Sequence, residues 1–317
     1  MEESVPLLFE TSDIDTIAFY AGRLIKRNTF LSHVEQTRTI LENRKYCINL
    51  CENRYHFLVA FAACTSLQQI SLLPSSRADK EIERIETSYK DNYRVDDRII
   101  EAICRKSNIK NDTVGNNLHI DSEKEVAIVF TSGSTGRPKA NLKTWRQLSE
   151  SAIRVKERLF NPELQYSVIA TVPPQHMYGF ETTIIYPLML GVAIHADRPF
   201  YPLDIRKALS EMPSPRVLIT TPIHLKACNS DKEKWPDIDF VVSATAVMQE
   251  EVAKEAEEVI NTQVFEIYGC SEAGAIATRQ MTRNPGWCLL RDYKINNKNN
   301  ESKLASSEKF MGSFRGR

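Results

Sequence analysis

The sequence predicts an α/β protein in which mostly parallel β-sheets are covered by helices. Short apolar runs that are typical of strands alternate along the chain with segments whose apolar residues recur at helical spacing. The run 46–73 shows this pattern as a strand, a helix and a second strand closed by Pro74. The chain has 317 residues, 42% of them hydrophobic, which suffices for one large or two ordinary domains.

The expected elements follow this alternation from the N-terminus onward. Short apolar runs predict strands at 46–50, 69–73, 126–130, 167–170, 192–195, 217–220, 240–243 and 262–265. Apolar residues on one face of a longer segment predict helices at 55–64, 75–89, 96–104, 145–159 and 247–260. The polar segment 108–122 is expected to be a surface connection. The apolar stretch 184–194 is far shorter than the ~20 residues of a membrane span, so it is expected in the core.

Composition excludes several classes of protein. Lys and Arg number 41 and so do Asp and Glu, so the chain lacks the positive charge of a general nucleic-acid binder. Seven cysteines without a C-x-x-C pair indicate reduced thiols in a cytoplasmic protein rather than disulfides or a zinc site. The start is acidic and no apolar segment follows it, so no signal peptide is expected. We therefore expect a soluble cytoplasmic protein with no membrane span and no nucleic-acid partner.

Residues 131–139 carry the most informative motif, Thr-Ser-Gly-Ser-Thr-Gly-Arg-Pro-Lys, between an expected strand and an expected helix. Gly133 and Gly136 let the backbone turn so that successive N–H groups converge on an anion, and Lys139 adds a positive charge. Four hydroxyl groups add donors: Thr131, Ser132, Ser134 and Thr135. The segment is predicted to bind phosphate, although its glycine-to-lysine spacing differs from that of G-x-x-x-x-G-K-[ST] loops.

This motif closely resembles the phosphate loop of the adenylate-forming (AMP-binding) superfamily, which includes acyl- and aryl-CoA synthetases, luciferases and adenylation domains of nonribosomal peptide synthetases. A second segment, 266–274, is similar to the family's aromatic-Gly-x-Thr-Glu motif, with Ser271 in place of threonine. The resemblance implies that the Tyr268 ring stacks on adenine and that Gly269 permits a backbone turn. It also implies that the Ser271 hydroxyl donates to the α-phosphate and that Glu272 is an oxygen ligand of Mg²⁺.

Two further segments resemble the same family. The segment 172–180 is similar to its Pro-x-x-His-x-x-Gly stretch, which implies that His176 lies beside the carboxylate and phosphate and orients the acid. The strand 240–243 ends where relatives have a Ser-Gly-rich turn whose backbone meets adenine and the acyl group. Ser243 and Ala244 occupy this turn here, and the added Cβ is expected to alter contacts to adenine or substrate.

The C-terminal part departs from the family pattern. Residues 1–288 are expected to form an incomplete AMP-binding N-terminal domain, and 289–317 a polar tail or an exposed hairpin. Relatives continue to a Thr-Gly-Asp motif and a small C-terminal lid with a lysine that assists adenylation, and none of these occurs before Arg317. The resemblance therefore implies the large N-terminal part of an adenylate-forming enzyme, without its lid domain.

The function implied by the resemblance is that of an acid–thiol ligase. Such an enzyme activates a small carboxylic acid with ATP and Mg²⁺ as an acyl-adenylate, and then transfers the acyl group to the thiol of CoA or of an acyl carrier protein. The expected catalytic residues are Lys139, His176, Ser271 and Glu272. The alternative is a lid-less, non-catalytic protein that binds nucleotide or an acyl group, or a truncated synthetase that needs a partner. Aromatic and medium-chain acids are equally compatible with the sequence.

Overall fold

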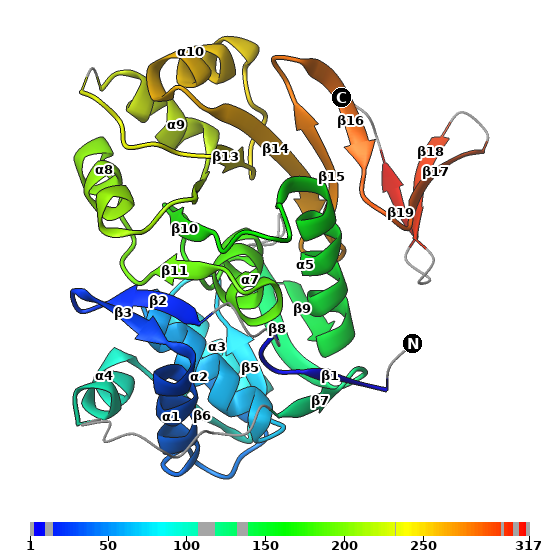
Figure 1. The fold of residues 1–317 in the computed structure, drawn as a ribbon. Helices are drawn as coiled ribbons and strands as arrows, with labels where there is room; N and C mark the ends of the chain where they lie inside the picture. Colours follow the sequence, from blue (N-terminus) through cyan, green and yellow to red (C-terminus); the bar gives the residue numbers. More distant parts are fainter. Residues whose placement is uncertain are drawn as a thin grey trace.

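Two β-sheets packed around shared helices make up most of the molecule (Figure 1). The computed structural model describes residues 3–9, 15–106, 118–131, 139–231, 233–298, 301–306 and 311–314. Within these ranges both sheets are parallel in their central part and carry antiparallel strands at their edges. The predicted α/β class, with mostly parallel sheets covered by helices, is confirmed.

The larger sheet positions most of the candidate site. In the part of the chain that the structure describes it has nine strands, in the spatial order β16 (Asn284–Leu289), β15 (Gly274–Gln280), β14 (Gln263–Cys270), β13 (Phe240–Ser243), β12 (Arg216–Thr220), β10 (Ser167–Ala170), β11 (Ala193–His195), β2 (Thr16–Tyr20) and β3 (Arg23–Lys26). The strands from β14 to β2 are parallel. The strands β15, β16 and β3 are antiparallel to their neighbours.

The smaller sheet carries the phosphate-loop motif. Its described strands follow the order β6 (Asn92–Val95), β4 (Tyr46–Asn49), β5 (Ile70–Leu73), β8 (Glu125–Thr131) and β9 (Lys139–Thr144). The predicted helix at 145–159 is confirmed as α5, but a strand that was not predicted, β9, comes before it and pairs antiparallel with β8. The buried positions of β9 are the polar residues Asn141 and Lys143, so the strand lacks the apolar alternation that would have announced it.

Helices separate and flank the two sheets. Their bounds are α1 (Arg27–Arg38), α2 (Arg54–Ser66), α3 (Asp79–Ser88), α4 (Asp97–Lys106), α5 (Trp145–Leu159), α6 (Met177–Phe180), the π-helix η1 (Glu181–Ile185), α7 (Tyr186–Leu190), α8 (Pro202–Glu211), α9 (Pro222–Asn229) and α10 (Glu250–Ile260). The Asn53 side chain accepts two backbone N–H groups at the start of α2, and Thr144 and Gln147 form a capping box at the start of α5.

The central core lies between the two sheets. Helix α2 contacts β4 and β5 of the smaller sheet and β11 of the larger one, and almost all of its residues are buried. This position explains why its sequence is apolar nearly all round. Helices α5 and α7 and the π-helix η1 pack into the same layer, so the predicted core location of the stretch 184–194 is confirmed.

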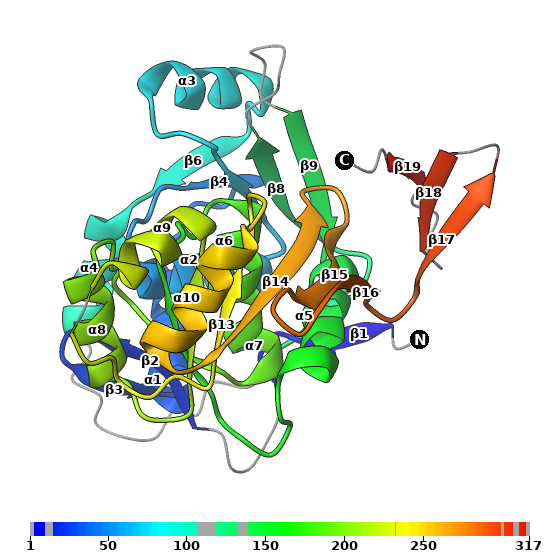
Figure 2. The same cartoon turned by 90° about the horizontal axis from the view of Figure 1, so that it is seen from above.

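The outer faces of the sheets are covered by separate helices. Helices α8, α9 and α10 lie over the larger sheet, and α3 lies over the smaller one (Figure 2). Leu209 of α8 and Leu225 of α9 pack with Leu218 of β12 in one cluster. Ile82 and Ile85 of α3 pack against β4, β5 and β8 in another. Each helix thus buries one apolar stripe and leaves most of its charged residues exposed.

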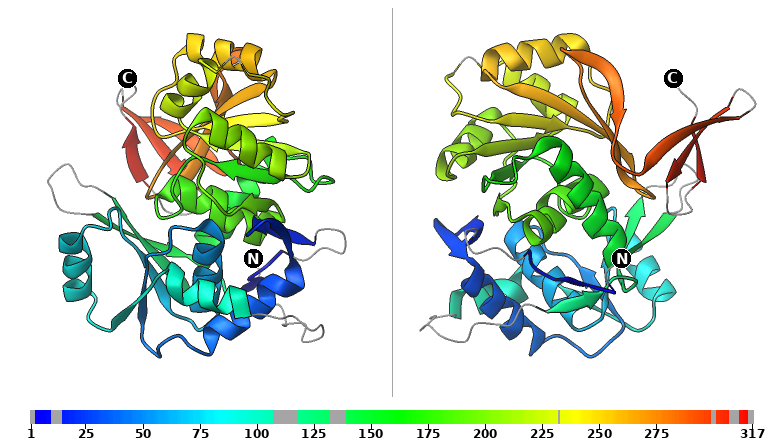
Figure 3. Two further views of the ribbon diagram at one scale, coloured as in Figure 1. Left: turned by 90° about the vertical axis from the view of Figure 1, so that its left-hand side faces the viewer. Right: turned by 45° about the vertical axis from the view of Figure 1, so that its right-hand side comes forward.

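Two smaller groups of strands lie outside these layers. The strands β17 (Tyr293–Lys298), β18 (Glu301–Ser306) and β19 (Met311–Phe314) form an antiparallel sheet that projects to one side (Figure 3). They fall within 289–317, and the predicted division of the chain after residue 288 stays a prediction. The strands β1 (Ser4–Pro6) and β7 (His119–Asp121) pair with each other. No helix in the described ranges combines the length and the apolar character needed to cross a membrane.

Candidate active site

The strand order of the larger sheet reverses at β10, because β11 lies on one side of it and β12 on the other. In open α/β sheets, ligands bind outside the carboxyl ends of the strands at such a point. Thr171 follows β10 and Thr220 ends β12, and their Oγ1 atoms are 3.0 Å apart. His224, in the first turn of α9, has its Nδ1 at 2.8 Å from Thr171 Oγ1. Polar side chains therefore converge where the topology favours a ligand.

His176 lies in the loop that leaves β10 and directly precedes α6. Partial burial and the positive charge of Arg198 lower the pKa of His176. Burial and the same arginine also lower the pKa of His224. A Cβ on Gly179 in α6 would lie 2.0 Å from the carbonyl oxygen of Pro173, so the packing of the helix against this loop requires glycine there. The predicted Pro-x-x-His-x-x-Gly segment is thus a loop packed against the start of α6, with an accessible His176 at their junction.

Ser243 ends β13, and its side-chain hydroxyl is buried without a hydrogen-bond partner among the described residues. A buried hydroxyl without a partner is unfavourable, and a bound ligand can satisfy it. Ala244 follows and is buried. Thr245 has a φ of 79°, a left-handed conformation that is an outlier for a β-branched residue. Backbone strain in this turn therefore falls on Thr245, while Ala244 adopts an ordinary conformation.

Tyr268 lies near the end of β14, and the residue is 36% exposed. Trp287 of β16 packs edge-on against it, with ring centroids 5.6 Å apart. The guanidinium of Arg279 lies 4.3 Å from the centroid of the Trp287 ring, and its Nε donates to Glu266 Oε2 at 2.6 Å. A partly exposed ring supported by this stack is suited to bind another flat ring. The geometry fits the adenine-stacking role predicted for Tyr268.

Gly269 is required for a close approach between strands. A Cβ at this position would lie 2.4 Å from the carbonyl oxygen of Gly274 across the β14–β15 ladder. Gly269 lies within β14, where the pairing with β15 shifts register between Tyr268 and Gly269, and its role in permitting the backbone turn stays a prediction. The turn follows at 271–273, and it contains Ser271 and Glu272. The pairing of β14 with β15 ends at Cys270 and Gly274, and the turn joins these two residues.

Lys139 Nζ donates a hydrogen bond to Glu272 Oε1 and so joins the phosphate-loop motif to the turn at 271–273. Lys139 opens β9 opposite Thr131, whose Oγ1 donates to the Lys139 carbonyl oxygen at 3.5 Å. The ammonium group holds the pKa of the Glu272 carboxyl below its usual range. The other phosphate-loop residues predicted to bind phosphate lie outside the described residues: Ser132, Gly133, Ser134, Thr135 and Gly136.

Glu272 fits a divalent cation that has few protein ligands. Across the described ranges, no group of three or more His, Cys, Asp or Glu side chains is arranged to hold a metal ion. Mg²⁺ at nucleotide sites is typically held by one or two carboxylates together with substrate phosphates. The Glu272 carboxylate is partly exposed and already binds a cation, the Lys139 ammonium. A negatively charged, accessible carboxylate is what a magnesium site of this kind requires.

Two buried charged residues behind this turn were not predicted as site residues. Lys143 Nζ donates to the carbonyl oxygen of Glu272 at 2.6 Å. Glu181 Oε1 accepts a hydrogen bond from Ser151 Oγ at 2.7 Å, and burial raises the pKa of the Glu181 carboxyl. In the sequence, Glu181 stands out only as a charged residue just before the apolar stretch 184–194. Lys143 lies in a polar run and gives no such signal. Trp287 had no signal at all, because strand pairing alone brings it to Tyr268.

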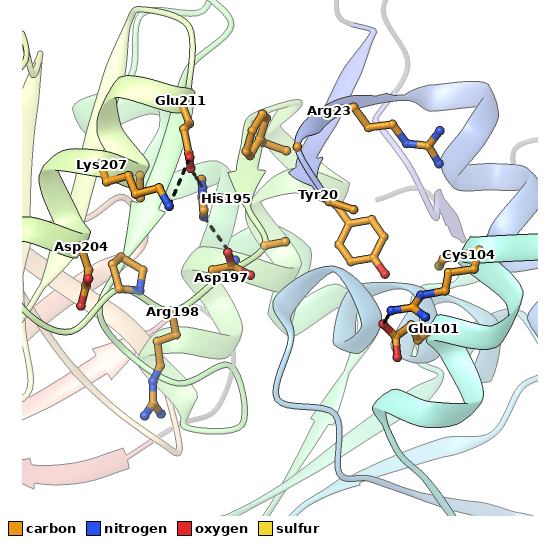
Figure 4. A pocket seen from close by; sticks show the side chains of 17 residues that line it. Tyr20, Arg23, Glu101, Cys104, His195, Asp197, Arg198, Asp204, Lys207 and Glu211 are labelled. Carbon is orange, nitrogen blue, oxygen red and sulfur yellow. Dashed lines mark hydrogen bonds and ion pairs between the residues drawn. The ribbon is translucent and has the colours of Figure 1, made fainter.

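A cavity of about 710 Å³ lies elsewhere, between the β2–β3 hairpin, α4 and α8 (Figure 4). The predicted motif residues that the structure describes do not line it. Its charged groups are partly paired with one another, since Glu211 accepts from His195 at 3.0 Å and lies 4.0 Å from Lys207. Arg54 connects the two places, because its guanidinium donates to the carbonyl oxygen of Asp197 in the cavity lining and to those of Ala170 and Val172 beside the reversal point. The cavity is therefore lined by other residues than the predicted site, although Arg54 joins the two through backbone hydrogen bonds.

Comparisons with known proteins agree with this geometry. A family model described as AMP-binding enzyme matches residues 36–306. A 4-coumarate–CoA ligase of Halorhodospira halophila is 27% identical over 166 residues, which are 52% of this chain and 38% of that protein. A 4-coumarate–CoA ligase of Rhodobacter capsulatus is 31% identical over 166 residues, 52% of this chain and 41% of that protein. The matched region spans about two fifths of these relatives.

Solved structures share the fold at lower sequence identity. Apo MatB from Rhodopseudomonas palustris has a TM-score of 0.76 and 17% identity, covering 96% of this chain and 70% of that chain. The o-succinylbenzoate coenzyme A synthetase MenE from Bacillus subtilis, in complex with AMP, has a TM-score of 0.72 and 14% identity, covering 92% and 67%.

Proposed function

The chain belongs to the family of AMP-binding enzymes, and on that premise we propose that it activates a carboxylic acid as an acyl-adenylate. The observation that carries the proposal is the hydrogen bond between Lys139 and Glu272. It brings the end of the phosphate loop together with the carboxylate proposed to hold Mg²⁺. Tyr268 is partly exposed on β14, the strand that leads into the turn at 271–273, and adds a place for a base.

The proposed reaction is an in-line displacement at phosphorus. A carboxylate oxygen of the acid attacks the α-phosphorus of ATP, the bond to the pyrophosphate oxygen breaks, and acyl-adenylate and pyrophosphate form. The barrier arises from repulsion between two anions and from charge that builds on the leaving pyrophosphate. Catalysis is therefore expected to come mainly from positioning and from electrostatic stabilisation.

Each residue of the site has a role in this proposal. Lys139 leaves Glu272 and places its ammonium group on the phosphates, together with backbone N–H groups of the loop. Glu272 would then hold Mg²⁺, which neutralises charge on the leaving group. The Ser271 hydroxyl donates to the α-phosphate, and His176 orients the acid. Partial burial and Arg198 lower the pKa of His176 and so favour the neutral ring, which can donate one hydrogen bond and accept another.

The acceptor of the acyl group is proposed to be the thiol of CoA. The curated relatives that match this chain are named as CoA ligases, which favours CoA over a carrier-protein thiol. The matched region covers 38% and 41% of the length of these relatives. That this chain carries out both the adenylation and the transfer to CoA is therefore part of the proposal. A cytoplasmic location fits an enzyme that uses ATP and CoA.

A second candidate function is nucleotide binding without turnover. It is favoured by the Lys139–Glu272 ion pair, in which each charge already has a partner within the chain. A chain that binds Mg·ATP but does not transfer the adenylate would keep the phosphate loop and the motif turn and lack the lysine that assists adenylation. The two functions differ in turnover, while both require binding of Mg·ATP.

Carboxylate-dependent exchange of labelled pyrophosphate into ATP tests the proposal. The purified chain is assayed with a panel of aryl, fatty and amino acids, with Lys139→Ala as the matched control. Exchange that needs one class of acid and is lost in the variant supports adenylation and names the substrate class. Tight binding of Mg·ATP with no exchange for any acid would overturn the proposal in favour of the binding protein.

A further inference from the structure

Lys143 is a buried cation in strand β9. It is 2% exposed, and its Nζ donates to the Glu272 carbonyl oxygen at 2.6 Å. Burial lowers the pKa of this lysine, and the charge of Glu181 opposes that effect. An ammonium group in the interior is unfavourable by several kcal/mol unless its charge and its hydrogen bonds are compensated. The chain therefore places an energetically costly group directly behind the residue proposed to hold the metal.

Glu181 and Ser151 hold the far end of the same turn. Ser151 Oγ donates to Glu181 Oε1 at 2.7 Å, and the Ala275 backbone N–H donates to Ser151 Oγ at 3.4 Å. Gly274 has a φ of +72°, and a Cβ on it would lie 2.5 Å from Glu181 Oε1 and 2.7 Å from Ser151 Oγ. The chain after Glu272 thus packs against Glu181 with no free space between them.

These contacts join three motif-bearing segments that are far apart in the sequence. Lys139 and Lys143 come from the strand that follows the phosphate loop, and they bind the carboxylate and the carbonyl of Glu272 respectively. Glu181 starts the π-helix that follows α6 and the His176 loop. Single π-helical turns are frequent at functional sites. The strand β9 therefore contacts the turn at Glu272. The start of the π-helix packs against the end of the turn at Gly274.

We propose that Lys143 is a positioning residue for a divalent cation bound by Glu272, with Glu181 and Ser151 packed against the other end of the same turn. The proposal rests on the proposed function only in assigning Glu272 to the metal. When a metal–nucleotide complex draws Lys139 away, the carboxylate loses its tether. The hydrogen bond from Lys143 then keeps the backbone of Glu272 in place, so that the carboxylate is aimed at the cation without a loss of ordering entropy.

Binding of Mn²⁺·ATP, compared with binding of ATP in excess chelator, tests this role. Both affinities are measured by titration calorimetry on the full chain and on Lys143→Met, which keeps the length of the side chain and removes its donor. Lys156→Met is the matched control, because Lys156 is partly buried on α5, contacts the Phe9 ring, and does not reach the turn. Thermal denaturation of each variant reports the folded fraction.

The expected result is a loss of about tenfold or more in Mn²⁺·ATP affinity for Lys143→Met, as for other residues that support a metal ligand. Metal-free ATP binding and the Lys156→Met control stay close to wild type, and Lys143→Arg, which retains a cationic donor, recovers part of the loss. An unchanged Mn²⁺·ATP affinity overturns the proposal. An equal loss of metal-free and metal-dependent binding also overturns it, since that would show a merely structural role.

A second variant covers the case in which Lys143→Met does not fold. Gly274→Ala forces the chain away from Glu181 and is expected to give the same loss of metal-dependent binding. A folded Gly274→Ala chain with the wild-type ratio of the two affinities overturns the proposal. If the wild-type chain binds Mn²⁺·ATP and shows no pyrophosphate exchange, the proposed function fails while the role of Lys143 can still be measured. If it binds no Mn²⁺·ATP, both fail.

Discussion

Lys139 and Glu272 lie 133 positions apart in the sequence, and the Lys139 ammonium donates a hydrogen bond to the Glu272 carboxylate. The side chains are 61% and 32% exposed, so the pair faces solvent and can exchange partners. Exposed ion pairs contribute only about 0–1 kcal/mol to stability. The contact is therefore of more use as a marker of the site than as a support of the fold.

Replacing Lys139 by alanine is expected to impair chemistry far more than folding. Removal of one group that stabilises the charge of the transition state typically lowers the rate about 10²–10³-fold. Pyrophosphate exchange measured beside thermal denaturation separates the two effects, with Lys254→Ala on α10 as an exposed-lysine control. A large fall in the melting temperature of Lys139→Ala would show instead that this lysine supports the fold.

Two glycines with positive φ allow a matched test of packing behind the Glu272 turn. Gly22→Ala is expected to cost about 1–2 kcal/mol, because its φ is +76° but a Cβ there meets nothing within 4 Å. Gly274→Ala should cost about 1–3 kcal/mol more, since its Cβ also collides with Glu181 and Ser151. Urea denaturation of both variants gives the two free energies of unfolding. Equal values would contradict the tight packing.

The stability of the chain is expected to depend on pH through Glu181. Burial raises the pKa of this carboxyl above its ordinary value. Between the ordinary and the raised value, the native chain holds a proton that the unfolded chain has released, so the free energy of unfolding falls as pH rises through this window. Glu181→Gln cannot ionise and should show a smaller slope, whereas Glu258→Gln on the exposed face of α10 should match wild type. Identical slopes for Glu181→Gln and wild type would refute this account.

Arg198 is expected to control the protonation of His176. Partial burial and the charge of Arg198 lower the pKa of the imidazole, so Arg198→Met should raise it toward its ordinary value. NMR titration of the histidine Cε1–H resonances, with His176→Asn for assignment, measures the change. The His224 resonance should move in the same direction. A pKa of His176 that does not respond to this substitution would place Arg198 too far away to matter.

Much of the fold could be predicted from the sequence because its strands are buried on both faces. Strand β10 has the predicted bounds, and β8 and β13 differ from prediction by a residue or none at each end. Strand β9 was missed because its buried side chains, Asn141 and Lys143, are polar and interrupt any apolar pattern. Element boundaries are set by caps and by tertiary contacts, and a single sequence shows these poorly.

The sequence predicted the motif residues of the candidate site, but it did not predict the residues that contact and position them. Lys139 and Glu272 could be named from motif order, and the structure brings them into contact. Lys143, Glu181 and Trp287 lie in no motif and act on the site only through pairings between distant strands and helices. Such contacts depend on the register of β9, β14 and β16, and no local pattern encodes that register.

The most direct test of acid activation is the fate of a carboxylate oxygen. The chain is incubated with ATP, Mg²⁺, CoA and the acid that supports exchange, labelled with ¹⁸O in its carboxylate, and the products are analysed by mass spectrometry. Attack of the acid on the α-phosphorus predicts one ¹⁸O atom in the released AMP. Label in inorganic phosphate, or AMP without label, would contradict the proposed acyl-adenylate and with it the central claim about this site.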